Sequence, residues 1–152
     1  MNNLLLPMLA VQGEPFDSAE HLFEVKWNGM RALAARDAGG WHLWGRDRAD
    51  YTFRYPELES LRRLPQDTVL DGELVLVPHG TPDLDALLAR HQLLDPIKVQ
   101  VAGQRHPVTY VLFDVLHYRG RSFLGRALQA RRQVLQQLLR DCPDPRLHFS
   151  EA

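Results

Sequence analysis

Residues 24–31 read EVKWNGMR and place a lysine, Lys26, between bulky apolar neighbours. Lysine is scarce in this chain, since Lys26 and Lys98 stand against sixteen arginines. A lysine amine can be shifted towards its neutral, nucleophilic form by burial or by nearby cations, whereas a guanidinium stays charged. Lys26 is therefore a candidate nucleophile. The alternative is an ordinary strand lysine whose amine extends to solvent.

The whole chain has the composition of a soluble globular domain. Of its 152 residues, 45% are hydrophobic and 24% are charged,. The net charge of -1 gives no global attraction to nucleic acid, so any basic surface must be local,. Cys142 is the only cysteine, which excludes an internal disulfide and a cysteine-built zinc site,. Residues 4–6 are apolar but end at Pro7, which fits neither a signal peptide nor a membrane span and predicts a cytoplasmic protein,.

The pattern of apolar and turn residues predicts a mixed α and β chain after an extended lead-in over residues 1–17. Apolar β-type runs separated by turn sequences predict strands over residues 22–27, 31–36, 41–46, 68–77 and 108–116, with a short run over 147–150,. Helical spacing and terminal charges predict helices over residues 56–64, 82–93 and 125–140,.

Two predicted strands carry polar side chains on a single face. In an extended stretch, Glu24, Lys26 and Asn28 share one face, which should border a cleft or solvent,. Asp71 and Glu73 also share a face, about 7 Å apart along their strand. Their other neighbours are apolar, so these charges need a partner or a ligand. For Asp71, an ion pair with an arginine is the alternative to a ligand role.

Three segments, in this order, resemble motifs of the covalent nucleotidyltransferases, which include DNA ligases, RNA ligases and capping guanylyltransferases. Residues 26–31 (KWNGMR) resemble KxDGxR, with Asn28 where that family has aspartate. Residues 70–75 (LDGELV) and 111–116 (VLFDVL) resemble the two motifs that follow. The intervening sequence is similar to the ligase domain of bacterial end-joining DNA ligases, so an RNA ligase or guanylyltransferase is the weaker interpretation.

This resemblance implies an α+β fold in which antiparallel β-sheets, flanked by helices, surround a nucleotide cleft (the covalent nucleotidyltransferase, ATP-grasp-like fold). The printed sequence contains no EGxVxK or WxKxK motif and nothing similar to an OB-fold. We therefore expect residues 1–152 to form the N-terminal part of an adenylation domain without an OB-fold domain.

The resemblance also implies roles for five residues at a nucleotide site. Lys26 would attack the α-phosphate of ATP and retain AMP. Glu24 would read the adenine amino group and so favour ATP over GTP, and Arg31 would bind ribose or phosphate oxygens. Glu73 would contact the ribose and help to hold Mg²⁺. Phe113 would stack on the adenine, the alternative being an ordinary core position.

Contacts with DNA are expected at arginines. Arg46 resembles the arginine that meets the 5′-phosphate of nicked DNA, although residues 45–48 depart from the family's SRNG-like pattern. A local basic cluster could contact phosphate or form a solvated helix face; it consists of Arg119, Arg121, Arg126, Arg131 and Arg132.

The implied function is that of an ATP-dependent DNA ligase-like adenylation domain for end joining and repair, using ATP and Mg²⁺. Full ligation is not expected from this chain alone, and two hypotheses stay open. The chain is either a residual adenylyltransferase, such as one half of a split ligase completed by a protein partner, or a catalytically impaired module that binds nucleotide or DNA ends, as Asn28 suggests. Unpaired sheet edges also predict a homo-oligomer.

Overall fold

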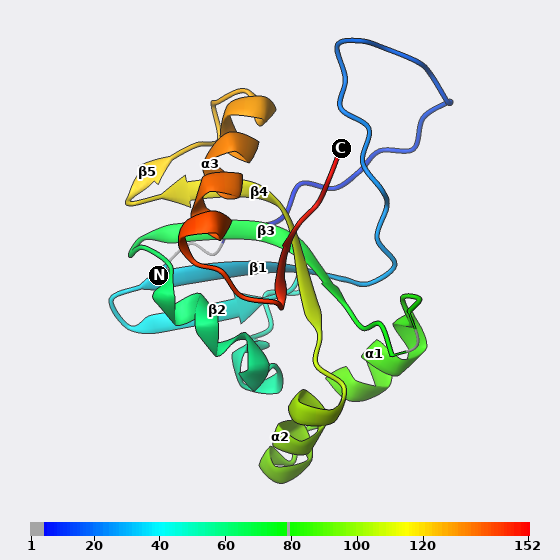
Figure 1. Cartoon of the computed structure of the whole chain (residues 1–152), viewed down its shortest axis with the longest axis vertical. Coiled ribbons are helices and arrows are strands. Elements are labelled where there is room, and N and C mark those ends of the chain that lie inside the picture. Colours follow the sequence, from blue (N-terminus) through cyan, green and yellow to red (C-terminus); the bar gives the residue numbers. More distant parts are fainter. Residues whose placement is uncertain (1–4, 79) are drawn as a thin grey trace.

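A single β-sheet forms the centre of the molecule (Figure 1). The computed structural model describes residues 5–78 and 80–152. Its strands are β1 (Met30–Asp37), β2 (Gly40–Trp44), β3 (Thr68–Val75), β4 (Thr109–Tyr118), β5 (Arg121–Ser122) and β6 (Leu147–Phe149). Their order is β2-β1-β3-β4-β5 with antiparallel neighbours, and β6 pairs with β4 in parallel. The predicted α+β fold with an antiparallel sheet is confirmed.

The helical segments lie between the strands and show clear terminal signals. Two 3-10 helices, η1 (Thr52–Arg54) and η2 (Pro56–Arg63), connect β2 to β3. Helices α1 (Leu84–His91) and α2 (Pro96–Arg105) connect β3 to β4, and α3 (Leu128–Asp141) follows β5. The Asp83 and Asp95 side chains accept backbone N–H groups at the start of α1 and α2,. No helix in the described part of the chain is both long and apolar enough to cross a membrane.

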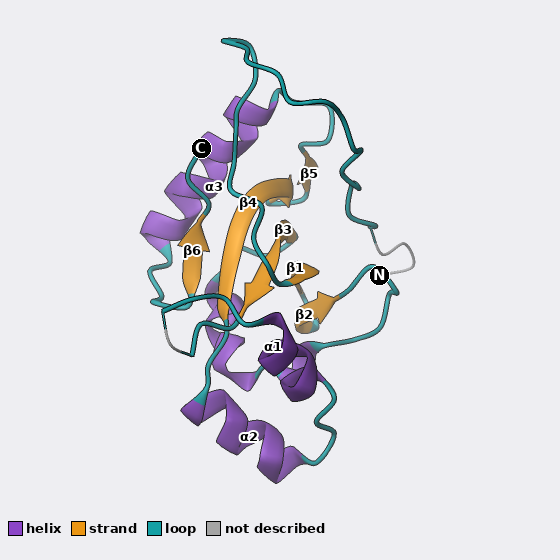
Figure 2. Ribbon diagram, turned by 90° about the vertical axis from the view of Figure 1, so that its right-hand side faces the viewer, coloured by secondary structure: helices purple, strands orange, loops and turns teal. Residues whose placement is uncertain are grey.

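The two faces of the sheet are covered differently. On one face, Leu70 and Leu74 of β3 belong to the main core together with Leu58 of η2, Leu87 of α1 and Leu135 of α3, all of them fully buried. This face therefore anchors the helices. Figure 2 shows α3 on one side of the sheet and the N-terminal segment on the other.

The opposite face is only partly covered and therefore leaves room for a site. A small apolar cluster there contains Leu33, Ala35, Trp44, Val69 and Leu116, with Leu5 of the N-terminal segment packed against it. The Trp44 indole N–H donates to the Leu5 carbonyl oxygen at 2.9 Å. Next to this cluster, the same face carries Arg31, Asp71 and Glu73, because β1 pairs with β3 in the register Arg31–Glu73 and Leu33–Asp71,.

Most predicted elements are present, but two regions differ from the prediction. The strand predicted over residues 22–27 is wrong, since this segment is extended without sheet pairing. None of the described strands lies beside it to bond its backbone groups, and most of its side chains are exposed,. Helix α2 forms where no helix is predicted, although Asp95 followed by Pro96 is a typical helix start,.

Candidate functional site

A cavity of about 560 Å³ opens on the partly covered face of the sheet. It is lined by residues of the N-terminal segment, β1, β3 and β4, by the start of α3 and by the segment that contains Lys26. Of the six predicted site residues, five line this cavity: Glu24, Lys26, Arg31, Glu73 and Phe113. The fold thus brings together residues that lie up to 89 positions apart, from Glu24 to Phe113.

Five residues form what we call the cavity floor: Arg31, Asp71, Glu73, Phe113 and Asp114. Within it, Arg31 and Asp71 form a bidentate ion pair. Arg31 donates from Nε and Nη2 to the two Asp71 carboxylate oxygens at 2.6 and 2.8 Å. Burial lowers the pKa of Arg31, but the hydrogen bonds and the charge of Asp71 outweigh this effect and raise it overall,. Of the two alternatives for Asp71, an ion pair with an arginine or a ligand role, the structure shows the ion pair.

Phe113 and Asp114 both reach the cavity because β4 contains a bulge, which keeps Asp114 on the same face as Phe113,. Leu112 pairs with Gly72 and Asp114 pairs with Asp71, so Phe113 is an extra residue without a partner on β3,. In a regular strand, Phe113 and Asp114 would point to opposite faces, yet both line the cavity,. The Arg31 guanidinium lies 4.4 Å from the centroid of the Phe113 ring. Phe113 is therefore a cavity residue and not a core residue.

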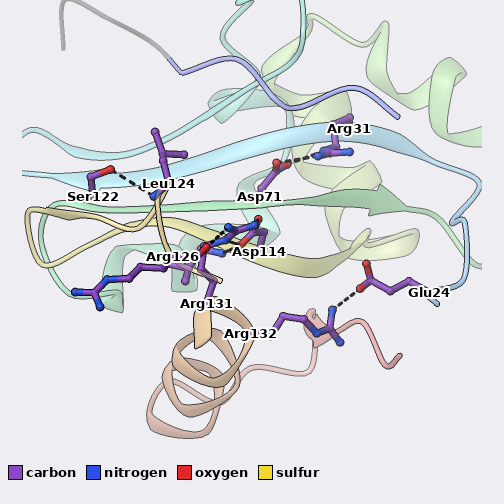
Figure 3. A network of polar contacts seen from close by, with 10 residues as sticks. Glu24, Arg31, Asp71, Asp114, Ser122, Leu124, Arg126, Arg131 and Arg132 are labelled. Carbon is purple, nitrogen blue, oxygen red and sulfur yellow. Dashed lines mark hydrogen bonds and ion pairs between the residues drawn. The ribbon is translucent and has the colours of Figure 1, made fainter. Parts of the chain in front are cut away.

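A second ion pair lies beside the first, as Figure 3 shows. Asp114 accepts two hydrogen bonds of 2.8 Å from Arg131 of α3. Because Asp71 and Asp114 are opposite each other on β3 and β4, two carboxylates face each other, and each has its own arginine. Arg132 also forms an ion pair, with Glu24, so the prediction of a solvated helix face is wrong for Arg131 and Arg132. A phosphate contact of the basic cluster stays a prediction.

Glu73 is the carboxylate of the floor that stays available. Among the described residues its side chain makes no hydrogen bond or ion pair. Burial raises its pKa, while the positive charges of Arg31, Lys26 and Arg46 act in the opposite direction,. Glu73 is therefore a partly buried carboxylate under the influence of three positive charges.

Lys26 belongs to an extended segment, residues 22–29, which we call the Lys26 segment. The Lys26 and Asn28 side chains are exposed, which fits the expectation that their face borders a cleft or solvent. Of the two means of activation that the sequence leaves open for Lys26, burial and a nearby cation, burial is not found. The segment closely approaches β3 at Gly29, where an added Cβ would lie 2.1 Å from the carbonyl oxygen of Leu74. Glycine is thus required at this position for Lys26 to lie near Glu73.

Arg46 is the predicted site residue that does not line the cavity. It lies two residues beyond β2, in an exposed loop, and β2 is shorter than the predicted strand over residues 41–46. At Gly45 the loop packs on the Tyr51 ring so closely that a Cβ would lie 2.1 Å from the hydroxyl oxygen. The positive charge of Arg46 nevertheless acts on Glu73 and works to lower the pKa of that carboxyl.

The carboxylates of the cavity are too few to hold a metal ion without further ligands from a nucleotide and water. No group of three or more possible metal-ligating side chains is found in residues 5–78 and 80–152. Asp71 and Asp114 are occupied by arginines, which leaves Glu73 as the available carboxylate. Mg²⁺ typically binds one or two carboxylates, several waters and substrate phosphates. The floor therefore fits Mg²⁺ that arrives with a nucleotide, and not a metal held by protein alone.

Comparison with known proteins gives consistent results for sequence and structure. Residues 7–152 match the family model described as ATP dependent DNA ligase domain. The chain is 34% identical over 139 residues to the multifunctional non-homologous end joining DNA repair protein LigD of Mycobacterium tuberculosis, and it is 30% identical over 132 residues to the SPbeta prophage-derived DNA ligase-like protein LigB of Bacillus subtilis. These matches cover 88% and 86% of the chain but only 17% and 46% of the relatives.

The solved ligase domain of M. tuberculosis LigD has a similar fold, with a TM-score of 0.62 and 30% identity over 84% of this chain and 38% of the other. A mycobacterial DNA ligase D complexed with ATP and MES superposes with a TM-score of 0.60 at the same identity, over 83% and 38% of the two chains. Since the family model matches nearly the whole sequence, the chain belongs to the ATP-dependent DNA ligase domain family.

Proposed function

We propose that the cavity binds ATP and that Lys26 accepts its AMP group. The Lys26 amine would attack the α-phosphorus, form an N–P bond, lose a proton and release pyrophosphate. The observation that carries this proposal is that Lys26, Glu73, Arg31 and Phe113 line one cavity although they come from four separate segments. A mycobacterial relative of similar fold was solved with ATP, which supports the same ligand here.

The floor residues supply the contacts that a nucleoside needs. Phe113 offers a ring on which adenine would stack, and Glu73 offers carboxylate oxygens to the ribose hydroxyls. Arg31 uses Nε and Nη2 for Asp71 and Met8, which leaves its Nη1 donors for ribose or phosphate oxygens,. Asp71 thus orients Arg31 and does not itself bind the nucleotide.

The attacking amine needs help to lose its proton. In water, about one lysine in a thousand is neutral at pH 7.4. Lys26 is exposed, so in this conformation burial does not supply the activation. Arg31 lines the same cavity, and Arg31 and Mg²⁺ bound at Glu73 and the phosphates are the cations proposed to supply the activation,. Mg²⁺ would also supply charge neutralisation for the departing pyrophosphate.

Nicked or broken duplex DNA is the proposed recipient of the AMP group, with Arg46 as a contact for the 5′-phosphate. Arg46 is exposed and lies near the site, as such a contact requires. The name of the LigD relative states a role in non-homologous end joining DNA repair, which favours DNA over RNA. Because the net charge is -1, this contact must be local and sensitive to salt,.

A protein partner or a second copy of the chain is proposed to complete the site. The N-terminal and Lys26 segments expose a series of large apolar side chains: Leu6, Met8, Leu9, Val11, Phe16, Leu22, Phe23 and Val25. Three of them, Leu6, Met8 and Val25, line the cavity. Exposed apolar side chains at the edge of a site favour a protein contact. Light scattering over a range of concentrations would detect self-association, and a monomer at every concentration would contradict the homo-oligomer.

Asn28 favours a second function, a module that binds nucleotide or DNA ends without catalysis. Asn28 replaces a family aspartate two residues from Lys26, and its amide lacks the negative charge and the proton-accepting capacity of a carboxylate,. This alternative predicts ATP binding without a covalent product.

Incubation with ATP labelled in the α-phosphate, in the presence of Mg²⁺, separates the two functions. The proposal predicts an acid-stable label on the protein, made alone or after addition of a C-terminal part of a related ligase. ATP binding without any label would establish the binding module instead. If ATP does not bind in either case, the adenylyltransferase and the nucleotide-binding module are both contradicted.

A further inference from the structure

Arg132 of α3 connects the predicted adenine-reading residue to the body of the protein. It is only 7% exposed, and its guanidinium forms an ion pair with Glu24 (Figure 3). The same guanidinium donates to the Ser150 carbonyl oxygen at 2.6 Å and lies 4.5 Å from the centroid of the Phe149 ring. A buried arginine with a single carboxylate partner depends on that partner.

A second contact fixes the Lys26 segment to the same place. The Trp27 indole N–H donates to the Ser150 hydroxyl oxygen at 3.2 Å. Ser150 is 1% exposed, and its own N–H donates to the carbonyl oxygen of Leu112 in β4. Lys26 is therefore held between Glu24 and Trp27, and both connections end at a residue bonded to the sheet.

We propose that Arg132 is a positioning residue that holds Glu24 for adenine recognition and thereby makes the site prefer ATP to GTP. This inference rests on the proposed function, because it assigns base selectivity to the same cavity. Arg132 does not contact the nucleotide itself. It acts through Glu24, whose side chain keeps 29% of its surface exposed.

The selectivity follows from the hydrogen-bonding capacity of an ion-paired carboxylate. Arg132 binds Glu24 at Oε1, which leaves Oε2 free to accept a hydrogen bond. The 6-amino group of adenine is a donor and suits this oxygen, whereas the 6-oxo group of guanine is an acceptor and would be repelled. Without Arg132, the Glu24 side chain would lose its fixed position, and its Oε2 would no longer point in a defined direction.

Binding of ATP and GTP to wild type and to Arg132→Gln, measured by calorimetry, tests this role. We expect wild type to bind ATP at least about tenfold more tightly than GTP, as a hydrogen bond to a charged group allows. Arg132→Gln should bring this ratio close to one by weakening ATP alone. Glu24→Gln should act in the same way, and the double variant should lose no more selectivity than either single variant. Arg132→Lys, which keeps a cation beside Glu24, should restore part of the preference.

The matched control is Arg140→Gln, on the same helix, since Arg140 is exposed and makes no side-chain hydrogen bond within the described chain. The ratio of its affinities for ATP and GTP should equal that of wild type. If Arg132→Gln weakens ATP and GTP by the same factor, Arg132 is merely structural and the inference fails. If wild type bound ATP and GTP equally tightly, the inference about Arg132 would be overturned, but the proposed binding of ATP would still hold. If wild type binds neither nucleotide, the proposed function fails and the selectivity fails with it.

Limited proteolysis with a lysine-specific protease tests the anchoring separately and needs no nucleotide, since Lys26 and Lys98 are the two lysines of the chain. Arg132→Gln and Glu24→Gln should each speed cleavage at Lys26 by at least about tenfold, because one of the two connections to Ser150 is lost. Cleavage at Lys98, in α2, should keep its wild-type rate. Unchanged cleavage at Lys26 in both variants would contradict the anchoring.

Discussion

The cavity floor and the Lys26 segment are held in place by different means. The floor lies on paired strands, and two buried carboxylates each accept two hydrogen bonds from an arginine. The Lys26 segment has no strand beside it among the described residues, and most of its side chains are exposed. Side-chain contacts to Ser150 and a close approach at Gly29 connect it to the sheet. We infer that the floor is preorganised, whereas the position of the nucleophile depends on a few contacts.

The largest effect is expected at Gly29, where the two regions touch. Gly29→Ala places a methyl group against the Leu74 carbonyl oxygen, so the Lys26 segment must move away from β3. We expect at least about a hundredfold slower formation of any lysyl-AMP, since small misplacements of reacting groups are costly. Circular dichroism should show a folded protein.

Gly13→Ala is the matched control for this substitution. No atom lies within 4 Å of a Cβ built at Gly13, so neither the rate nor the stability should change. An unchanged rate in Gly29→Ala would show that the approach to β3 does not position Lys26.

Substitutions in the cavity floor should lower the unfolding free energy of the protein. Asp71→Asn leaves the Arg31 guanidinium without its carboxylate in a site where Asp71 is 2% exposed. Breaking a buried ion pair from one side costs about 3 kcal/mol of unfolding free energy, measurable by urea denaturation. Arg62→Gln removes the surface ion pair with Glu59 and should cost less than about 1 kcal/mol,. Equal losses in both variants would contradict the preorganised floor.

Phe113 should affect nucleotide affinity more than stability. Phe113→Leu keeps an apolar side chain but removes the ring, and stacking on a base contributes about 1–3 kcal/mol. We therefore expect the Kd for ATP to rise about tenfold or more. Phe53→Leu, at an exposed phenylalanine in η1, should leave the Kd unchanged. If both variants bind ATP as wild type does, Phe113 does not stack on the base.

The smallest effect is a change in the pH dependence of stability at Glu73. Burial raises the pKa of Glu73, so the native state keeps this proton to higher pH than the unfolded chain. Between the two pKa values the native state binds more protons, and the unfolding free energy falls as the pH rises. Glu73→Gln cannot ionise at this position, so it lacks this fall in unfolding free energy. The variant should therefore gain stability relative to wild type as the pH rises from about 4 to about 7.

Glu59 provides a control of opposite sign. Hydrogen bonds from Arg62 and Trp41 lower the pKa of Glu59, so its ionised form stabilises the native state, and this contribution is lost as the pH falls,. Glu59→Gln should be less stable than wild type at neutral pH, and the difference should shrink in acid. If the stability of both variants relative to wild type changed in the same direction with pH, the partly buried environment assigned to Glu73 would be contradicted.

Much of the floor could be predicted from the sequence, because its residues lie within regular strands or recognisable motifs. The alternation in β3 places Asp71 and Glu73 on one face, as found. The position of Asp114 on the same face as Phe113 could not come from alternation, since the bulge depends on how β4 pairs with β3,. The stacking role predicted for Phe113 rests on the resemblance of residues 111–116 to a family motif.

The Lys26 segment shows why other predictions fail. Its alternating side chains are typical of a strand, but a strand also needs a neighbour to bond its backbone. Likewise, Arg132 is one of several arginines in the sequence, and nothing local predicts that a residue 108 positions away, Glu24, is its partner. Such pairs follow from tertiary structure alone.

The most direct test of the central claim is to locate the covalent product. The protein is incubated with ATP and Mg²⁺, digested, and analysed by mass spectrometry for peptides that have gained one AMP. We predict a single modified residue, Lys26, and no product in Lys26→Arg, because a guanidinium is too weak a nucleophile. AMP found on another residue, or equally in Lys26→Arg, would contradict the assignment of Lys26 as the acceptor.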